Sequence, residues 1–226
     1  MKAGGLKLRA ELELDRFALD PYCKLYLPLW KLDGDSFADR SAYGHLCTNY
    51  GSLWTPQGRK FDGVDDYVET EANPAFDVSQ ITVEGWALSY SGDGDYKAIA
   101  TEKYTATVKF ELHMASSKLT ASFNDGTWHT ISDPDAFPLN QWQHCVGTYD
   151  GHYIRLYRNG NQVAISGDLN LALPSGTNIW RVGRRHDTSG EGNIWNGLID
   201  EVRIYNRALT PQEILDHYII GKEMFG

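Results

Sequence analysis

GLIDEVRIYNRALTPQEI, residues 197–214, changes from the residue pattern of a strand to that of a helix. Its first half is rich in β-branched residues, which favour strands because their side chains pack well on a pleated surface. In the second half Thr210 can cap a helix, Pro211 suits the first helical position, and Glu213 can complete a capping box with Thr210. The stretch therefore predicts a long strand followed by one short C-terminal helix.

The chain before this stretch reads as a series of short strands. Apolar runs are separated by Gly, Asp, Asn and Pro at intervals of roughly ten residues, which is typical of a sandwich or jelly roll. Between the strands at 152–160 and 161–167, the pair Asn159-Gly160 supplies the positive φ angles of a tight hairpin. The other predicted strands are residues 23–32, 81–90, 98–103, 107–115, 118–125 and 141–150.

Length and composition favour one large all-β domain. The chain has 226 residues, and its many Trp, Tyr and Gly residues with few Met favour strands and turns over helices. We expect an N-terminal arm or linker at 1–22 and a single domain at 23–226. The net charge of −9 argues against nucleic acid as a partner, because phosphate backbones would be repelled.

The cysteines and the N-terminal segment bear on the compartment. Cys23, Cys47 and Cys145 are an odd number without close spacing, so we expect buried free thiols. Charges interrupt the apolar residues of 1–22, which therefore resemble neither a signal peptide nor a membrane span. We expect no membrane insertion. The localisation stays open: the chain acts where it is made, joins a larger assembly, or is part of a longer secreted protein.

Six motifs occur together in one order along the chain. They are DRSAYGH (39–45), KFDGVDDYVE (60–69), ITVEGW (81–86), NQWQHCVGTYDG (140–151), IRLYRNG (154–160) and the opening stretch (197–214). In these motifs the chain resembles the LamG-like jelly rolls of the concanavalin A-like lectin/glucanase superfamily over about residues 23–220. The resemblance implies two antiparallel sheets with adjacent chain ends, and it implies that Trp86 and Trp142 are core residues.

The acidic stretch FDGVDDYVE (61–69) is a candidate metal site. Calcium takes six to eight oxygen ligands and accepts them from distant segments. Members of the resembled family often carry calcium, and we expect a structural calcium to be shared by Asp62 and Asp200 if their strands meet at one edge. The alternative is that both aspartates cap backbone N–H groups without a metal, because Asp-Gly is also an ordinary turn.

A catalytic centre is not complete in the sequence. Retaining glycosidases need two carboxyl groups about 5 Å apart, and the E-x-D-x-x-E strand of related glucanases is missing here. The lyase relatives use an Arg, a Gln or His, and a Tyr on adjacent strands. Glu111 and His113 share one face of KFELHM without the rest of that set. We therefore expect no enzyme activity, with a polysaccharide-cleaving enzyme as an alternative.

Exposed aromatic residues favour carbohydrate recognition. Sugars present apolar C–H faces beside hydroxyl groups, so their sites pair an aromatic platform with polar side chains. Trp128, in the turn-rich segment NDGTWHT (124–130), is our first platform candidate, with Asn124 and His129 close by in the sequence. Tyr104 is a further candidate ligand residue. Tyr96 and Trp54 are weaker platform candidates.

The sequence thus predicts a non-catalytic carbohydrate-binding or adhesion module with a structural calcium and a glycan or polysaccharide as ligand. An alternative is a virion structural or decoration protein that uses the same fold. In that case residues 1–22 would dock the domain onto a larger assembly.

Overall fold

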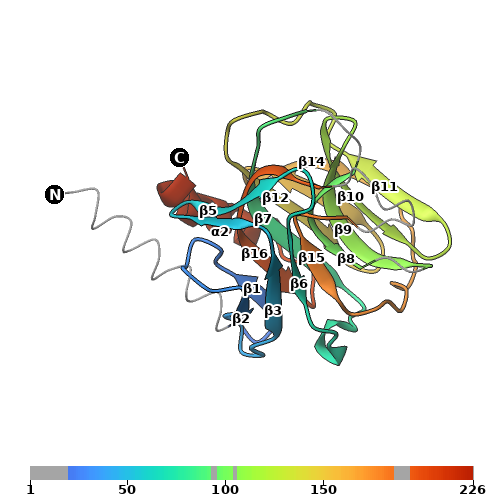
Figure 1. Cartoon of the computed structure of the whole chain (residues 1–226). Helices are drawn as coiled ribbons and strands as arrows, with labels where there is room; N and C mark the ends of the chain where they lie inside the picture. The colour runs from blue at the N-terminus through green and yellow to red at the C-terminus, as the bar shows by residue number, and fades with distance from the viewer. Residues whose placement is uncertain (1–19, 93–95, 104–105, 186–193, 226) are drawn as a thin grey trace.

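The computed structural model describes residues 20–92, 96–103, 106–185 and 194–225. Over these residues the chain forms two antiparallel sheets and one C-terminal α-helix (Figure 1). This confirms the predicted all-β jelly-roll sandwich. Residues 1–19 of the predicted arm lie outside the described residues, so a separate arm stays a prediction.

The first sheet, sheet A, contains the first and the last strand of the domain. Its strand order is β14-β13-β12-β7-β16-β5-β4, and β1 also pairs with β16. Cys23 of β1 lies opposite Tyr205 of β16, so the chain ends are adjacent, as the resemblance implied. The strands are β1 (Cys23–Leu27), β4 (Leu53–Thr55), β5 (Gly58–Asp62), β7 (Ile81–Ser89), β12 (Gln143–Tyr149), β13 (Ile154–Arg158), β14 (Asn161–Ile165) and β16 (Asn196–Tyr205).

The second sheet, sheet B, has the order β11-β10-β9-β8-β15-β6-β3-β2. Its hairpin of β10 and β11 corrects the sequence analysis, which treated the segment around Trp128 as turn-rich. Only the turn between the two strands is irregular. The strands are β2 (Ser36–Ala38), β3 (Leu46–Tyr50), β6 (Tyr67–Thr70), β8 (Lys97–Glu102), β9 (Val108–Ala115), β10 (Lys118–Asn124), β11 (Trp128–Ser132) and β15 (Trp180–Val182).

The helix α2 (Pro211–Phe225) begins where the sequence predicted. The backbone N–H of Glu213 donates to the Thr210 hydroxyl at 3.3 Å, and the backbone N–H of Thr210 donates to the Glu213 carboxylate at 2.8 Å. This is a capping box. The helix lies against β12 and β14 of sheet A. A short 3₁₀ helix, η1 (Pro74–Phe76), precedes β7.

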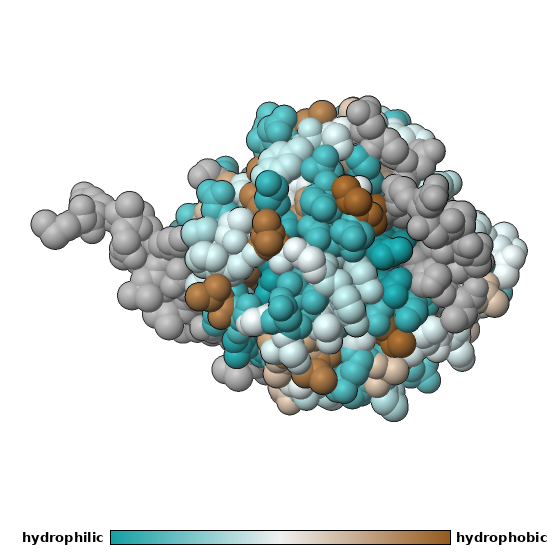
Figure 2. Space-filling model, in the orientation of Figure 1, coloured by the Kyte–Doolittle hydropathy of each residue, from teal (hydrophilic) through white to brown (hydrophobic). Residues whose placement is uncertain are grey.

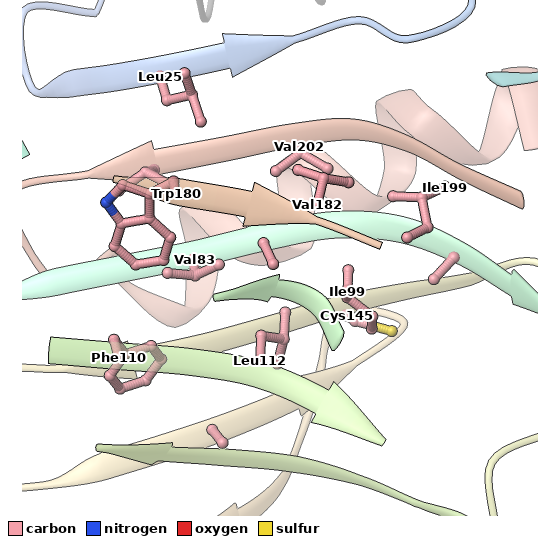
Figure 3. Close-up of a cluster of buried hydrophobic side chains, with 14 of the residues drawn as sticks. Leu25, Val83, Ile99, Phe110, Leu112, Cys145, Trp180, Val182, Ile199 and Val202 are labelled. Carbon is pink, nitrogen blue, oxygen red and sulfur yellow. The ribbon is translucent and has the colours of Figure 1, made fainter. Parts of the chain in front are cut away.

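The main core lies between the two sheets (Figure 3). Sheet A contributes Val83, Ile199 and Val202, and sheet B contributes Phe110 and Trp180. Val83, Phe110 and Val202 each lie between two polar residues of their strands, because successive side chains of a strand point to opposite faces.

Trp86 is buried, as we expected, although it lies outside the main cluster between the sheets, and Trp142, which we also expected in the core, is only half-buried. The Trp86 ring stacks on Phe225 of α2 at 4.7 Å between ring centroids. Trp142 also contacts Phe225. Both tryptophans therefore attach the helix to the outer side of sheet A.

A charged cluster is buried beneath the same helix. Glu84 of β7 accepts a hydrogen bond from Arg203 at 2.9 Å, and Nδ1 of His217 in α2 lies 3.0 Å from its carboxylate oxygens. His144 of β12 approaches the same carboxylate at 3.4 Å. Burial alone would raise the pKa of Glu84, but His217, His144 and Arg203 together hold that pKa well below its ordinary value. The contact between His217 and Glu84 therefore links the helix to sheet A.

The three cysteines, Cys23, Cys47 and Cys145, are buried and free, as the sequence predicted. Burial raises the pKa of the Cys23 thiol to about 12. The face drawn in Figure 2 is mostly polar, with apolar side chains in small separate groups. Among the described residues, no helix has the length and apolar character that crossing a membrane requires.

Candidate functional site

The outer face of sheet B carries an uninterrupted polar row. On β9, Phe110 and Leu112 point into the core, so Glu111 and His113 lie on the opposite face, as the period of KFELHM predicted. The strand register extends this row across neighbouring strands, where each residue lies opposite the next. Its members are Thr130, Ser122, Glu111, Thr101, Arg181 and Glu69.

A pocket of about 380 Å³ lies over the β9–β11 part of this face. Aromatic rings of Trp128 and Tyr96 line it together with the polar side chains of Glu111, Ser122 and Arg185. The Ser122 hydroxyl donates to Glu111 at 2.8 Å. Elsewhere in the pocket, the Thr120 and Ser132 hydroxyl groups lie 3.0 Å apart. The pocket thus combines aromatic surface with fixed hydrogen-bonding groups.

Arg185 organises the pocket. Its guanidinium donates to both carboxylate oxygens of Glu111, from Nε at 2.8 Å and from Nη2 at 3.2 Å. The guanidinium carbon also lies 4.3 Å from the Tyr96 ring centroid and 5.0 Å from the Trp128 ring centroid. Cation–π attraction and the bidentate ion pair therefore fix the two aromatic rings and the acid relative to one another.

His113 is a buried polar group of the same pocket. Its Nδ1 lies 3.5 Å from the nearest Glu111 oxygen and has no hydrogen-bond partner among the described residues. Burial lowers the pKa of His113, although Glu111 opposes this effect. Burial therefore favours the neutral form of the ring.

The four residues predicted to contact the ligand do not all line the pocket. Trp128 lines the pocket as expected. Asn124 lies opposite Trp128 in the ladder, but its side chain accepts a hydrogen bond from the backbone of Gly126 at 2.7 Å and so shapes the turn. Tyr104 falls outside the described residues.

His129 does not line the pocket, which corrects the expectation from its proximity to Trp128 in the sequence. It is the next residue along β11, so its side chain points to the other face of the sheet. There its ring packs on the core residue Phe123, at 4.7 Å between ring centroids. Of the weaker candidates, Tyr96 lines the pocket and Trp54 lies on β4 of the other sheet.

The two aspartates predicted to share calcium do not meet. Their strands β5 and β16 are paired, as expected, but Asp62 lies opposite Asn196, which is four residues before Asp200. At about 3.3 Å per residue, the two acids are about 13 Å apart along the ladder. Asp200 instead lies beside Gly58, at the other end of β5. The sequence predicted the right strand neighbours but the wrong register.

Asp62 belongs instead to a group of three aspartates in the turn after β5. Ligand oxygens of Asp62, Asp65 and Asp66 lie within 4.8 Å of one another. Asp62 accepts hydrogen bonds from the backbone of Val64 and Asp65, and Asp66 accepts one from the backbone of Asp62. These carboxylates thus already cap the turn.

Asp200 is fully buried in a different environment. Its Oδ1 accepts hydrogen bonds from the backbone of Trp30 at 3.2 Å and of Glu201 at 2.7 Å. Its Oδ2 has no hydrogen-bond partner among the described residues. Burial, together with the neighbouring charge of Glu201, raises the pKa of Asp200 well above its ordinary value.

Comparison with known protein families assigns the chain to one of them. Residues 62–215, more than half of it, match the family model described as "Concanavalin A-like lectin/glucanases superfamily". The chain belongs to this superfamily. Among curated proteins, no sequence gives a significant match.

Solved structures share this concanavalin A-like fold at low sequence identity. One is domain 4 of an extracellular arabinanase from Geobacillus stearothermophilus in complex with arabinotriose, with a TM-score of 0.68 and 18% identity over 87% of this chain and 98% of that chain. Another is the botulinum neurotoxin serotype D binding domain, with a TM-score of 0.71 and 14% identity over 89% of this chain and 52% of that chain. The chain thus spans about half the length of the neurotoxin domains that it matches.

A third structure comes from botulinum neurotoxin type C, a toxin that depends on interaction with two ganglioside molecules to enter cells. Its TM-score is 0.68, with 13% identity over 92% of this chain and 52% of that chain.

Sequence reasoning missed Arg185, the residue that connects the pocket. It follows β15 in the segment RVGRRHD (181–187), where nothing in the residue pattern shows which strand the side chain will reach. Glu111 could have indicated that a cation lies nearby, because a buried carboxylate on the outer face of β9 is costly without an ion-pair partner.

Proposed function

We propose that this domain is a non-catalytic carbohydrate-binding module and that its ligand occupies the pocket on the outer face of sheet B. The observation that carries the proposal is the group formed by Arg185, the rings of Trp128 and Tyr96, and the Glu111 carboxylate. A sugar ring can place its apolar face on an aromatic ring while its hydroxyl groups bond to fixed donors and acceptors. Arg185 already holds the two rings and the carboxylate in place, so the binding of a sugar would cost little side-chain entropy.

The relatives support this class of ligand. The arabinanase domain has the same fold over nearly its whole length, and its structure contains arabinotriose. Neurotoxin type C interacts with gangliosides, which are also glycan-bearing molecules. Neutral oligosaccharides and glycolipid headgroups both contain hydroxyl-rich sugar rings. The aromatic rings and hydrogen-bonding side chains of the pocket suit such rings.

A glycan array with wild type and two single variants tests the proposal. Trp128→Ala removes an aromatic ring from the pocket, whereas Trp54→Ala removes a ring of similar exposure, 39% against 41%, from the opposite sheet. Loss of the array signal in Trp128→Ala alone supports the proposal. Absence of any wild-type signal, or equal signals in both variants, would contradict it.

We also propose that the domain binds calcium. The turn of Asp62, Asp65 and Asp66 supplies clustered carboxylates, and Asp200 supplies a buried oxygen without a hydrogen-bond partner among the described residues. Both arrangements suit a hard cation that prefers oxygen ligands. The ion would stabilise the end of the sandwich where it binds and would take no part in chemistry.

A second candidate function is cleavage of an acidic polysaccharide. Arg185, His113 and Tyr96 line one pocket, and these are the residue types that the lyase relatives use. The lowered pKa of His113 favours its neutral imidazole, which is the form that accepts a proton. New unsaturated-uronate absorbance from a polysaccharide panel, lost in Tyr96→Phe, would assign this activity. Its absence with intact glycan binding supports recognition alone.

A further inference from the structure

Two stacked tyrosines lie on the outer face of sheet B, nearer to its β2 edge. Tyr50 of β3 and Tyr67 of β6 are direct partners in the ladder, and their rings are nearly parallel with 4.4 Å between centroids. Arg181 and Arg184 place their guanidinium carbons 4.9 and 5.2 Å from the Tyr67 ring centroid. The Tyr67 ring is thus held between Tyr50 and the two arginines, while the Tyr50 side chain remains 42% exposed.

The backbone fixes this stack. Gly51, directly after Tyr50, has a φ of +80°, and an added Cβ would lie 2.1 Å from the Asp66 carboxylate. Asp66 is itself buried and directly precedes Tyr67. Since a φ of +80° favours glycine and an added Cβ would displace the buried Asp66 carboxylate, a side chain at position 51 would disturb the segments on both sides of the stack.

A second hollow, of about 330 Å³, opens beside the stack. Tyr50, Tyr67, Asp65 and Arg184 line it. Among the described residues, no carboxylate lies within ion-pair distance of Arg184. Its guanidinium is therefore available as a donor next to an aromatic ring, and Asp65 offers an acceptor. Aromatic surface with a donor and an acceptor is the same combination as in the first pocket.

The strand register puts both hollows on the outer face of sheet B. Glu111 of β9 and Glu69 of β6 belong to the same cross-strand row, through Thr101 and Arg181. Antiparallel pairing across three ladders then brings the next outward residues, His113 and Tyr67, to the same side of that row. The stack is therefore level with the His113 side of the first pocket, whereas Trp128, which pairs with Asn124, lies on the other side of the row. A ligand that contacts both Trp128 and Tyr50 would cross the sheet diagonally.

The spacing suits a chain of sugars. From β9 to β6 there are three inter-strand steps, or about 14 Å, and from β11, which carries Trp128, to β3, which carries Tyr50, there are six steps, or about 29 Å. Arg184 and Arg185 are consecutive residues, and one lines the second hollow while the other lines the first. The separation exceeds the size of one sugar ring, and the polar row with Thr101 and Arg181 lies between.

We propose that the Tyr50–Tyr67 stack is a second sugar-binding subsite and that the ligand is an extended oligosaccharide that spans both hollows across sheet B. This inference rests on the proposed carbohydrate binding and adds the form of the ligand. A terminal monosaccharide would use one hollow only, whereas an internal stretch of a polymer would contact both.

The test is affinity as a function of chain length, measured by calorimetry. The probes are arabino-oligosaccharides from disaccharide to octasaccharide, with the matching ladder of the polymer that gives the strongest array signal. Wild type is compared with Tyr50→Ala, Tyr50→Phe, Trp128→Ala and the control Tyr90→Ala, which removes an exposed tyrosine that lines neither hollow. Melting temperatures confirm that each variant is folded.

We expect wild-type affinity to rise with chain length and then level off. Tyr50→Ala should lose roughly three- to tenfold for long chains and nothing for the shortest binder, because one stacking contact is removed. Tyr50→Phe and Tyr90→Ala should behave as wild type. Equal affinity of wild type and Tyr50→Ala for every length would overturn the second subsite while leaving the first intact. Absence of binding to every ladder would overturn both proposals.

Discussion

Arg185 and Glu111 form a two-pronged ion pair, with N–O distances of 2.8 and 3.2 Å, on the outer face of sheet B. The Glu111 side chain is almost completely buried, so water does little to stabilise its charge. Arg185 connects the segment after β15 to β9, which lies two positions away in the sheet order β9-β8-β15. The pocket therefore depends on one contact for both its shape and its charge balance.

Arg185→Gln should destabilise the domain strongly. Removing one partner of a buried ion pair leaves an uncompensated charge and typically costs about 3–5 kcal/mol. The double variant Arg185→Gln/Glu111→Gln should recover part of that loss, since no charge is left unpaired. Urea unfolding of the wild type, both single variants and the double variant measures the coupling. Additive effects of the two substitutions would contradict the ion pair.

Acid should weaken the contact between sheet A and the helix. The pKa of Glu84 is depressed in the folded state, so its contribution to the free energy of unfolding is complete above its ordinary value of 4.5 and is lost as the pH falls below it. We expect thermal stability to decline through this range, with a smaller decline in Glu84→Gln. Glu84→Gln should also be less stable than wild type near neutral pH, because Arg203 loses a buried partner. Identical pH profiles of the two proteins would exclude Glu84 as the cause.

Calcium should raise the melting temperature of the wild type relative to chelator, since a ligand bound only by the folded state stabilises it. The variants separate the two candidate locations. If the ion binds the turn, Asp62→Asn abolishes the shift and Asp200→Asn retains it. If it binds near Asp200, the results are reversed. Equal melting temperatures with calcium and chelator would refute a calcium site at either place.

Thr210→Ala should cost about 1 kcal/mol, the usual penalty for loss of a helix N-cap. The Thr210 hydroxyl both accepts from the Glu213 backbone and donates to its carboxylate, and Arg207 donates to the same carboxylate from two nitrogens. These hydrogen bonds, chiefly those of Arg207, lower the pKa of Glu213 to about 2. Gln212→Ala, one position into the helix, is the matched control. The same change in stability for both variants would show that the cap is unimportant.

Several strands and the start of the helix were predictable because their signals are local. Period-two alternation placed β7, β9, β10 and β12 within two residues of their ends, and the capping box placed the start of α2. The Asn159-Gly160 hairpin is also confirmed, with positive φ at both residues.

The candidate site was less predictable because it depends on register and on long side chains. The distance between Asp62 and Asp200 follows from which residues of β5 and β16 pair, and a register is not visible in either strand alone. His129 was misplaced because β11 was not recognised as a strand, so the opposite directions of Trp128 and His129 went unnoticed.

Carbohydrate binding in the pocket beside Trp128 can be measured directly. The experiment compares the affinity of the strongest array ligand for wild type, Trp128→Ala and Trp54→Ala, by calorimetry on proteins with matched melting temperatures. We predict that Trp128→Ala weakens binding by on the order of tenfold to a hundredfold, as loss of an aromatic anchor does, whereas Trp54→Ala binds as wild type does. Unchanged affinity in Trp128→Ala, or an equal loss in Trp54→Ala, would contradict the assignment of this pocket.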